Sequence, residues 1–175
     1  MTRPVPILIL AMLAVQPPAV AQTGAPKGGA KPGALSIDTP IQPLLSRAEA
    51  GDPAAMFYLG AKYSEGRGVP KDEAEGLRWY RKVAERGHSG AMLNVGNSYY
   101  NGRGVAEDRT EAAHWFRLAA ERGHAGAMYN LAICYAGGQG VEKDETEAVK
   151  WFRASAAKGN PRAMAALNSR GLGLQ

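Results

Sequence analysis

The sequence repeats itself every 36 residues. Residues 87–122 and 123–158 align without a gap, and 18 of the 36 aligned positions are identical, which indicates internal duplication. A glycine, a methionine and a tryptophan recur at this period: Gly51, Gly87, Gly123, Gly159, Met56, Met92, Met128, Met164, Trp79, Trp115 and Trp151. A period of about 20–50 residues is typical of units that stack into a solenoid with an extended working surface. The repeat therefore favours a binding module over an enzyme.

Each repeat contains the signals for two helices joined by a turn. In the first repeat, Asp52 and Pro53 are typical of a helix start, and apolar residues then follow at helical spacing. A Gly-x-Gly sequence interrupts this pattern, and Asp72 with Glu75 resembles a capping box that opens a second helix. We expect first helices (helix A) at about 53–64, 89–100, 125–136 and 161–169, and second helices (helix B) at about 72–86, 108–122 and 144–158.

Two histidines and the Gly-x-Gly turns could suggest bound ions or cofactors. His88 and His124 occupy the position that Asp52 fills in the first repeat and Asn160 in the last, so we expect them to cap helices. No companion cluster of metal ligands accompanies them. The Gly-x-Gly turns lie between predicted helices and lack the Gly-Lys of a phosphate loop. We therefore expect no metal and no cofactor.

The repeats define the domain organisation. Full repeats span about residues 51–86, 87–122 and 123–158, and a C-terminal half-repeat spans 159–169. A shortened helix B ahead of Gly51 would cap the N-terminal end of the stack. The predicted fold is all-α: a short solenoid of helix-turn-helix repeats over residues 41–169, with a tail at 170–175.

The first forty residues differ from the repeats in composition. Arg3 precedes a short apolar run, and Ala19-Val20-Ala21 matches the cleavage pattern of a secretory signal peptide, which we place at residues 1–21. An uncleaved anchor is the alternative. Residues 22–40 are rich in Gly, Pro and Ala, which favours a disordered linker. These features predict a periplasmic or secreted protein that is not inserted in the membrane after signal cleavage.

Charge and cysteine content add two exclusions. The net charge of +5 is scattered along the predicted helices, which is typical of a solvated surface and does not indicate nucleic-acid binding. A single cysteine, Cys134, excludes an internal disulfide. Lys62 and Ser98 hold the same repeat position, so we interpret Cys134 as a small filler; pairing with another chain is the alternative. We expect a monomer.

The repeat motifs resemble a known family. Each repeat carries a variant of A-x-x-x-L-G-x-x-Y, then G-x-G-V-x-x-D, then E-A-x-x-W-[FY]-x-x-A-A-x-x-G. The first copy consists of Ala55, Leu59, Gly60, Tyr63, Gly66, Gly68, Val69, Asp72, Trp79, Tyr80, Ala84 and Gly87. This combination resembles the Sel-1-like repeat family, relatives of tetratricopeptide repeats. The resemblance implies a right-handed alpha-alpha superhelix that acts as an adaptor in protein complexes, without a catalytic site shared by the family.

An enzymatic alternative rests on one short motif. Ser155 and Lys158 match the S-x-x-K of penicillin-recognising enzymes, and some cysteine-rich members of the resembled family carry a beta-lactamase label. A beta-lactamase-like or cell-wall-acting hydrolase is therefore the second hypothesis. Against it, Ser155 falls on the core-facing stripe of its helix, where the other repeats have Val83 and Ala119. No S-D-N or K-T-G sequence accompanies it.

The candidate binding surface is a second stripe of helix A. It lies about a third of a turn from the packing face and mixes aromatic, aliphatic and amide side chains, as peptide-binding grooves do. The candidate residues are Phe57, Leu93, Asn97, Tyr100, Tyr129 and Ile133. In the resembled fold this stripe lines the concave surface, so we expect a protein or peptide partner there. The alternative is that some of these residues pack on helix A of the next repeat. On helix B, we expect Trp115 to be buried.

Overall fold

The computed structural model of the protein describes residues 35–173, and every regular element in this range is an α-helix. The helices are α1 (Ile41–Glu49), α2 (Pro53–Glu65), α3 (Glu73–Ala84), α4 (Ser89–Asn101), α5 (Arg109–Glu121), α6 (Ala125–Gly137), α7 (Glu145–Ala157) and α8 (Pro161–Asn168). They coincide closely with the predicted helices A and B, which confirms the all-α repeat fold. The predicted signal peptide and most of the predicted linker, residues 1–34, lie outside the described residues.

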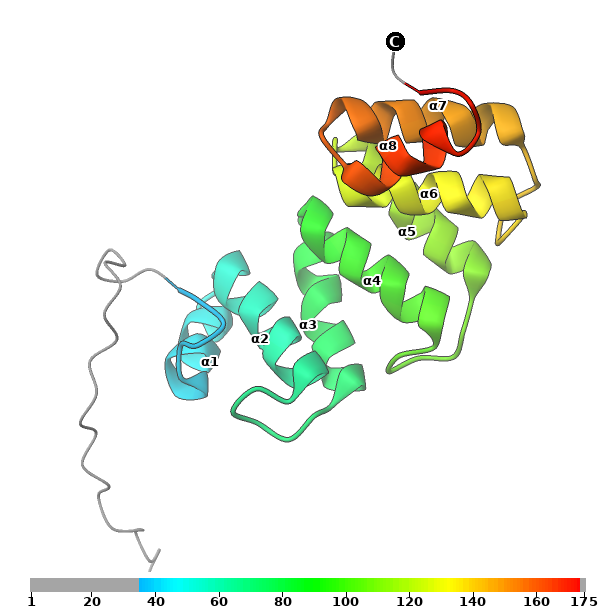
Figure 1. Cartoon of the computed structure of the whole chain (residues 1–175). Coiled ribbons are helices and arrows are strands. Elements are labelled where there is room, and N and C mark those ends of the chain that lie inside the picture. Colours follow the sequence, from blue (N-terminus) through cyan, green and yellow to red (C-terminus); the bar gives the residue numbers. More distant parts are fainter. Residues whose placement is uncertain (1–34, 174–175) are drawn as a thin grey trace, which may run out of the picture. The chain divides into compact units, whose positions relative to one another are not determined.

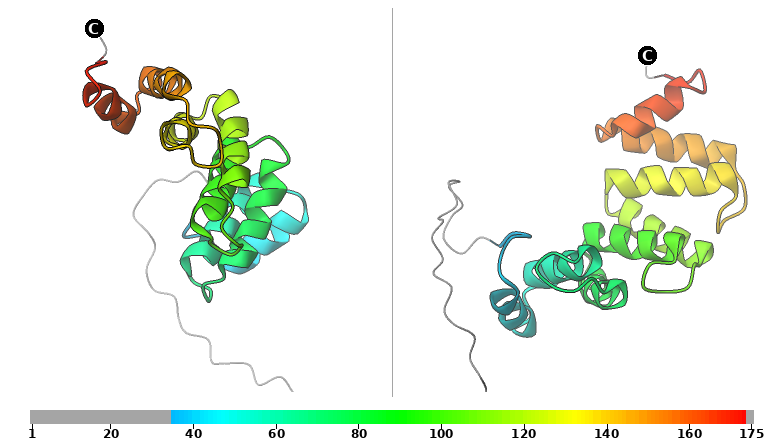
Figure 2. Two further views of the ribbon diagram at one scale, coloured as in Figure 1. Left: turned by 90° about the vertical axis from the view of Figure 1, so that its right-hand side faces the viewer. Right: turned by 60° about the horizontal axis from the view of Figure 1, so that its bottom comes forward.

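The described helices stack in chain order. The tightest pairs are α2 with α3, α4 with α5, and α6 with α7, which are the helix A and helix B of one repeat. Each helix B also packs on helix A of the next repeat, so α3 touches α4 and α5 touches α6. Figures 1 and 2 show the same succession from three directions. Because each repeat contacts mainly its neighbours, the fold is a solenoid built from local contacts.

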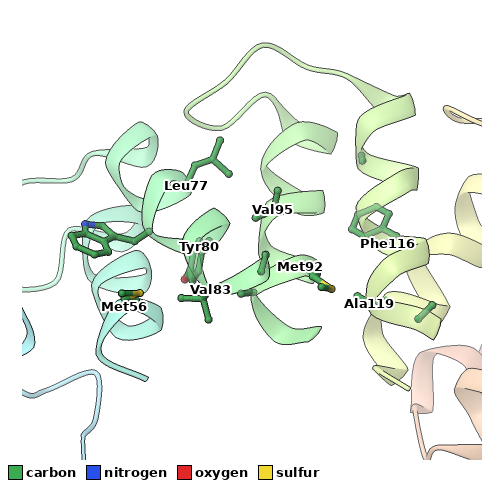
Figure 3. Close-up of a cluster of buried hydrophobic side chains, with 14 of the residues drawn as sticks. Met56, Leu77, Tyr80, Val83, Met92, Val95, Phe116 and Ala119 are labelled. Carbon is green, nitrogen blue, oxygen red and sulfur yellow. The ribbon is translucent and has the colours of Figure 1, made fainter. Parts of the chain in front are cut away.

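The core runs along this stack as an alternation of helix A and helix B side chains. Figure 3 shows Met92 and Val95 of α4 between Tyr80 and Val83 of α3 on one side and Phe116 of α5 on the other. Val83 and Val95 are fully buried, and Phe116 is 1% exposed. The helix α4 is therefore held by apolar contacts on two sides, which is how stacked repeats stabilise one another.

In the second and third repeats the phenylalanine after the tryptophan, and not the tryptophan itself, fills the core, whereas Trp79 and Tyr80 of the first repeat are both buried. Phe116 and Phe152 are buried, whereas Trp115 is half-buried, so the prediction that Trp115 is buried between helices is wrong. Its indole Nε1–H donates to Glu111 Oε1 at 2.8 Å, at the edge of the helix. One residue turns an α-helix by about 100°, so Trp115 and Phe116 point in different directions and only Phe116 faces the core.

Every helix A from α2 onward begins with a side-chain cap. Asp52 Oδ1 accepts from the backbone N–H of Ala54 at 2.9 Å, and Asn160 does the same in α8. His88 Nδ1 accepts from the N–H of Ala91 at 3.0 Å, and His124 Nδ1 accepts from the corresponding N–H of α6 at 3.3 Å. The prediction that the two histidines are N-caps is confirmed. An imidazole can accept at Nδ1 only while that nitrogen is unprotonated.

The capping box of helix B is only half formed. Asp72 Oδ1 accepts from the N–H of Glu75 at 2.9 Å, and the equivalent aspartates cap α5 and α7. The glutamate, however, does not reach back to the cap as predicted. Glu75 instead pairs with Arg78 at 2.6 Å, and Glu147 pairs with Lys150 at 2.8 Å. A cation one turn further along the helix competes successfully for the carboxylate.

Acidification is expected to weaken the start of α6. Burial lowers the pKa of His124 below its ordinary value of 6.5, and the neighbouring His88 acts in the same direction. The unfolded chain therefore binds the proton more readily. The contribution of the cap is complete above about pH 6.5 and is lost as the pH falls below it. We expect a loss of up to about 1 kcal/mol, reduced by solvent screening, when this cap fails.

The variant His124→Asn tests this account, because Asn160 already caps α8 in the same position. Urea denaturation between pH 7.5 and pH 5 should show a shallower loss of stability in the variant than in the wild type. The two proteins should be similarly stable at pH 7.5. Equal pH slopes for both would contradict a role of His124 in acid sensitivity.

The Gly-x-Gly turns connect one repeat to the previous one. Their first glycines end helix A in the left-handed conformation, with φ between 64° and 73°. The second glycines also have positive φ, and two of them lie too close to a neighbouring backbone to carry a Cβ. A Cβ at Gly140 would overlap the backbone of Arg109 at the start of α5, and one at Gly104 would overlap Glu73 at the start of α3. The second and third turns thus rest directly on the N-terminus of the preceding helix B.

Candidate functional site

Two cavities lie along the stripe of helix A that the sequence predicts as a binding surface. The larger, cavity 1, has a volume of about 310 Å³ and lies among α4, α5 and α6. It is lined by Asn97, Tyr100, Asn101, Phe116, Tyr129, Asn130 and Ile133. Four of the six candidate residues, Asn97, Tyr100, Tyr129 and Ile133, are therefore brought together around one cavity.

The aromatic walls of cavity 1 are anchored in the core. The ring of Tyr100 lies against Phe116, with centroids 6.1 Å apart, and the ring of Tyr129 lies against Phe152 at 5.7 Å. The Tyr100 hydroxyl donates to Gln139 Oε1 in the following Gly-x-Gly turn. The cavity is thus preformed, because its tyrosines are fixed at the ring and, for Tyr100, at the hydroxyl as well.

Three asparagine side chains form the polar rim of cavity 1. Asn130 Nδ2 donates to Asn97 Oδ1 at 3.1 Å, and Asn101 Nδ2 donates to the backbone carbonyl of Asn97 at 2.8 Å. Within the described chain, these bonds leave the Nδ2 donors of Asn97 and the Oδ1 acceptor of Asn130 without protein partners. Both residues line the same cavity, so one donor group and one acceptor are available there for a peptide group.

Cavity 1 carries no formal charge among the described residues. Its lining consists of amide, phenol, phenyl and aliphatic groups. The nearest cation, Arg109, stacks on the ring of Tyr100 with its guanidinium carbon 4.1 Å from the centroid, and it is paired with Glu107 at 2.7 Å. A charged group placed in this cavity would therefore lose hydration without gaining an opposite charge.

Cavity 2 is the equivalent space one repeat earlier. It has a volume of about 190 Å³, and it is lined by Ser64, Glu65, Glu73, Tyr80, Asn94, Asn97, Ser98 and Arg103. Tyr80, Ser64 and Asn94 precede Phe116, Tyr100 and Asn130 by 36 residues. Asn97 lines both cavities, so the two are adjacent across α4.

The electrostatics of cavity 2 differ from those of cavity 1. Burial, together with the nearby Glu65 carboxylate, raises the pKa of Tyr80 to about 12, so this phenol stays neutral. Glu65 is paired with Arg67 at 2.5 Å, and Glu73 is paired with Lys71 at 2.7 Å. Arg103, in contrast, has no partner within residues 35–173. Cavity 2 therefore contains one cation without an ion-pair partner, beside two carboxylates that are each paired with another cation.

The remaining two candidate residues, Phe57 and Leu93, line neither cavity. Phe57 lies against Tyr80 at 5.4 Å and against His88 of the next repeat at 5.0 Å, both measured between ring centroids. Leu93 Cδ2 lies 3.5 Å from the point where a Cβ would stand on Gly126. For these two positions the alternative reading holds, because both residues pack on the start of helix A in the next repeat.

Sequence reasoning missed three residues of cavity 1. Phe116 comes from helix B and belongs to the apolar stripe that fills the core. Asn101 lies at the very end of α4. Asn130 offered a signal, since Asn94 occupies the same position one repeat earlier and also lines a cavity. Recurrence of a polar residue on an otherwise apolar helix A could have identified it.

The proposed hydrolase nucleophile is enclosed in the core. Ser155 is 0% exposed, and its Oγ–H donates to the backbone carbonyl of Ala125 at 2.8 Å. Asn160 Nδ2 donates to the same carbonyl at 3.3 Å. A serine held in this way joins α7 to the start of α6 and cannot reach a substrate without local unfolding.

Cys134 is likewise enclosed. The thiol is 0% exposed, and burial raises its pKa to about 11, which makes it a poor nucleophile at neutral pH. This environment fits the filler role and does not offer a thiol to another chain. Across residues 35–173, no group of three or more His, Cys, Asp or Glu side chains is arranged to hold a metal ion.

None of the described helices is both long enough and apolar enough to cross a bilayer.

Comparison with known proteins places these features in a family. The model of the Sel1 repeat family matches residues 53–88, 89–124 and 125–160. The chain belongs to the Sel1 repeat family, as its motifs predicted. No curated protein sequence matched the chain.

Solved structures with the same architecture include two close in sequence. A Sel1 repeat protein from Oxalobacter formigenes is 37% identical, with a TM-score of 0.67 over 74% of this chain and 97% of that one. The protective antigen c5321 of uropathogenic Escherichia coli, which displays an SLR fold, is 35% identical, with a TM-score of 0.73 over 79% of this chain. The match spans only 30% of the antigen's own length.

A more distant likeness concerns the fold alone. Cysteine-rich protein B of Helicobacter pylori is 21% identical and has a TM-score of 0.60, over 75% of this chain and 94% of that one.

Proposed function

We propose that the protein is an exported, non-catalytic adaptor that binds a peptide segment of another protein in cavity 1. The observation that carries this proposal is the open amide pair of Asn97 and Asn130 beside an uncharged aromatic wall. Such a pair can accept and donate one hydrogen bond each to a peptide group, while the aromatic wall holds the adjacent side chain. Sel1 repeat proteins generally mediate protein–protein interactions, which agrees with this role.

The hydrolase alternative receives less support. It needs Ser155 exposed in a cleft with Lys158 in reach, whereas Ser155 is buried and hydrogen-bonded to Ala125. The lining of cavity 1 contains no carboxylate, histidine, lysine, serine or cysteine. Nitrocefin turnover that disappears in a Ser155→Ala variant would restore the alternative.

The double variant Asn97→Ala, Asn130→Ala tests the proposal without removing an aromatic anchor. Because Tyr100 and Tyr129 lean on Phe116 and Phe152, replacing the tyrosines would also weaken the core. A random dodecapeptide library displayed on phage, selected against residues 22–175, supplies the ligands. We expect the double variant to bind the enriched peptides at least about tenfold more weakly by calorimetry, the effect of two lost hydrogen bonds.

Asn168→Ala is the matched control, since this exposed asparagine of α8 lines neither cavity. It should bind the peptides like the wild type, and all three proteins should unfold at similar urea concentrations. A selection without enriched peptides, or peptides that bind the double variant as tightly as the wild type, would contradict the proposed function.

Export is the second part of the proposal. The apolar run after Arg3 and the Ala19-Val20-Ala21 sequence support cleavage after Ala21. Expression of the full chain in a bacterial host should therefore yield a periplasmic or secreted species. Its intact mass should equal that of a chain that begins at Gln22. A membrane-bound species that retains Met1 would favour the anchor instead.

A further inference from the structure

We infer that the peptide bound by this protein carries an apolar side chain in cavity 1 and an acidic side chain at Arg103, on the far side of α4. This inference rests on the proposed function and adds the chemistry of the ligand. Cavities 1 and 2 occupy equivalent positions in successive repeats, but their linings differ in charge. The inference rests on this difference.

Cavity 1 selects an uncharged side chain. Phe116, Tyr129 and Ile133 supply its apolar surface, and no ionised group in the described chain lines it. Arg109, which stacks on Tyr100, already has Glu107 as its partner. An aromatic or branched aliphatic side chain gains apolar burial there, whereas a charged one would be desolvated without meeting an opposite charge.

Cavity 2 selects a negative charge. The position that Arg103 occupies in its Gly-x-Gly turn is filled in the other turns by Arg67, which is paired with Glu65, and by Gln139, which accepts from Tyr100. Of these three side chains, only Arg103 lacks a partner within the described residues. Both carboxylates of cavity 2 are already paired with Arg67 and Lys71, so they do not neutralise Arg103.

One ligand can reach both places. Asn97 belongs to both cavities, and α4 is the only helix that separates them. A helix is about 10 Å wide, and an extended chain advances about 3.3 Å per residue, so about three residues cross α4. The acidic residue is therefore expected about three positions from the apolar one, with the peptide group between them over the amides of Asn97 and Asn130.

Charge reversal at Arg103 tests this inference. The same dodecapeptide selection should enrich sequences with Phe, Leu, Ile or Val about three positions from Asp or Glu. For one such peptide, replacing the acidic residue with Lys should weaken binding to the wild type by about fivefold, the size of one partly exposed ion pair. The Arg103→Glu variant should bind the Lys version of the peptide more tightly than the acidic version. Arg103 is exposed in a turn, so the fold should tolerate the change.

Arg153→Glu provides the control. It makes the same change of charge on α7, which contributes no residue to either cavity. It should leave the preference for the acidic peptide intact. Peptides that depend on Asn97 and Asn130 but show no acidic preference, or a preference unchanged by Arg103→Glu, would overturn the inference while leaving the proposed function standing. A selection that enriches no peptide would overturn both.

Discussion

Replacing Phe116 with alanine is expected to lower the free energy of unfolding by about 3–5 kcal/mol. Phe116 is 1% exposed and lies at the middle of the stack, between α4 and α5 and next to the α6 contacts of cavity 1. A Cβ on Gly96 would lie 2.6 Å from its ring, so the ring fits directly against the α4 backbone. Removing it leaves a void that the neighbouring helices cannot close without moving. The measurement is urea denaturation followed by helical circular dichroism.

Trp115→Ala is the matched comparison, because it removes a larger ring from the adjacent position. Trp115 is half-buried and its indole donates only to Glu111 at the helix edge. We expect a loss of about 1–2 kcal/mol, clearly below that of Phe116→Ala. If Trp115→Ala lowered the free energy of unfolding more than Phe116→Ala, Trp115 and not Phe116 would be the core ring.

Replacing Gly140 with alanine is expected to be the next most damaging change. Gly140 has φ of 72°, which costs a residue with a Cβ about 1–3 kcal/mol. In addition, the new Cβ would overlap the backbone of Arg109, which cannot rotate away as a side chain could. Overpacking of this kind adds about 1–3 kcal/mol. Thermal unfolding of the variant should show a strongly lowered midpoint.

Gly68→Ala separates the two causes. Gly68 has the same φ, 71°, but the only atom near a Cβ there is Lys62 Nζ at 3.8 Å, since α1 is too short to reach this turn. We expect Gly68→Ala to cost only the conformational strain. Equal losses for Gly68→Ala and Gly140→Ala would contradict the direct packing of the third turn on the N-terminus of α5.

The helices and their caps were predictable because repeats fold through local contacts. The predicted helix ends agree with the observed ones within a residue or two. The signals were the periodic apolar residues, the Asp52-Pro53 start and the glycines that end helices. Details set by competition between side chains were not predictable from spacing. Glu75 was expected to complete a capping box, yet Arg78 one turn away takes its carboxylate.

The choice between adjacent aromatics was the main error. Trp115 and Phe116 are both large and apolar, so periodicity alone did not decide which one faces α4. A smaller signal was present: Gly60, Gly96 and Ala132 recur on helix A as the small residues against which Tyr80, Phe116 and Phe152 pack. Pairing small with large positions across repeats would have identified the core ring.

The candidate site was predictable where it lies on one helix face and not where two helices meet. Asn97 and Tyr100 were found because they share a stripe of α4, and Tyr129 and Ile133 because they share one of α6. Phe116 reaches the same cavity from α5, and Arg103 stands in a turn. Their positions depend on how consecutive repeats pack, and the sequence pattern of one repeat does not determine that packing.

The most direct test of peptide binding in cavity 1 is the nuclear magnetic resonance of the side-chain amides themselves. The Nδ2 resonances of Asn97 and Asn130 can be assigned from the two single alanine variants and followed during titration with an enriched dodecapeptide. We predict that both resonances shift in proportion to the bound fraction, together with backbone signals of α4 and α6, while Asn168 stays unchanged. Shifts confined to helix B residues, with both amides unmoved at saturation, would contradict a binding site at this cavity.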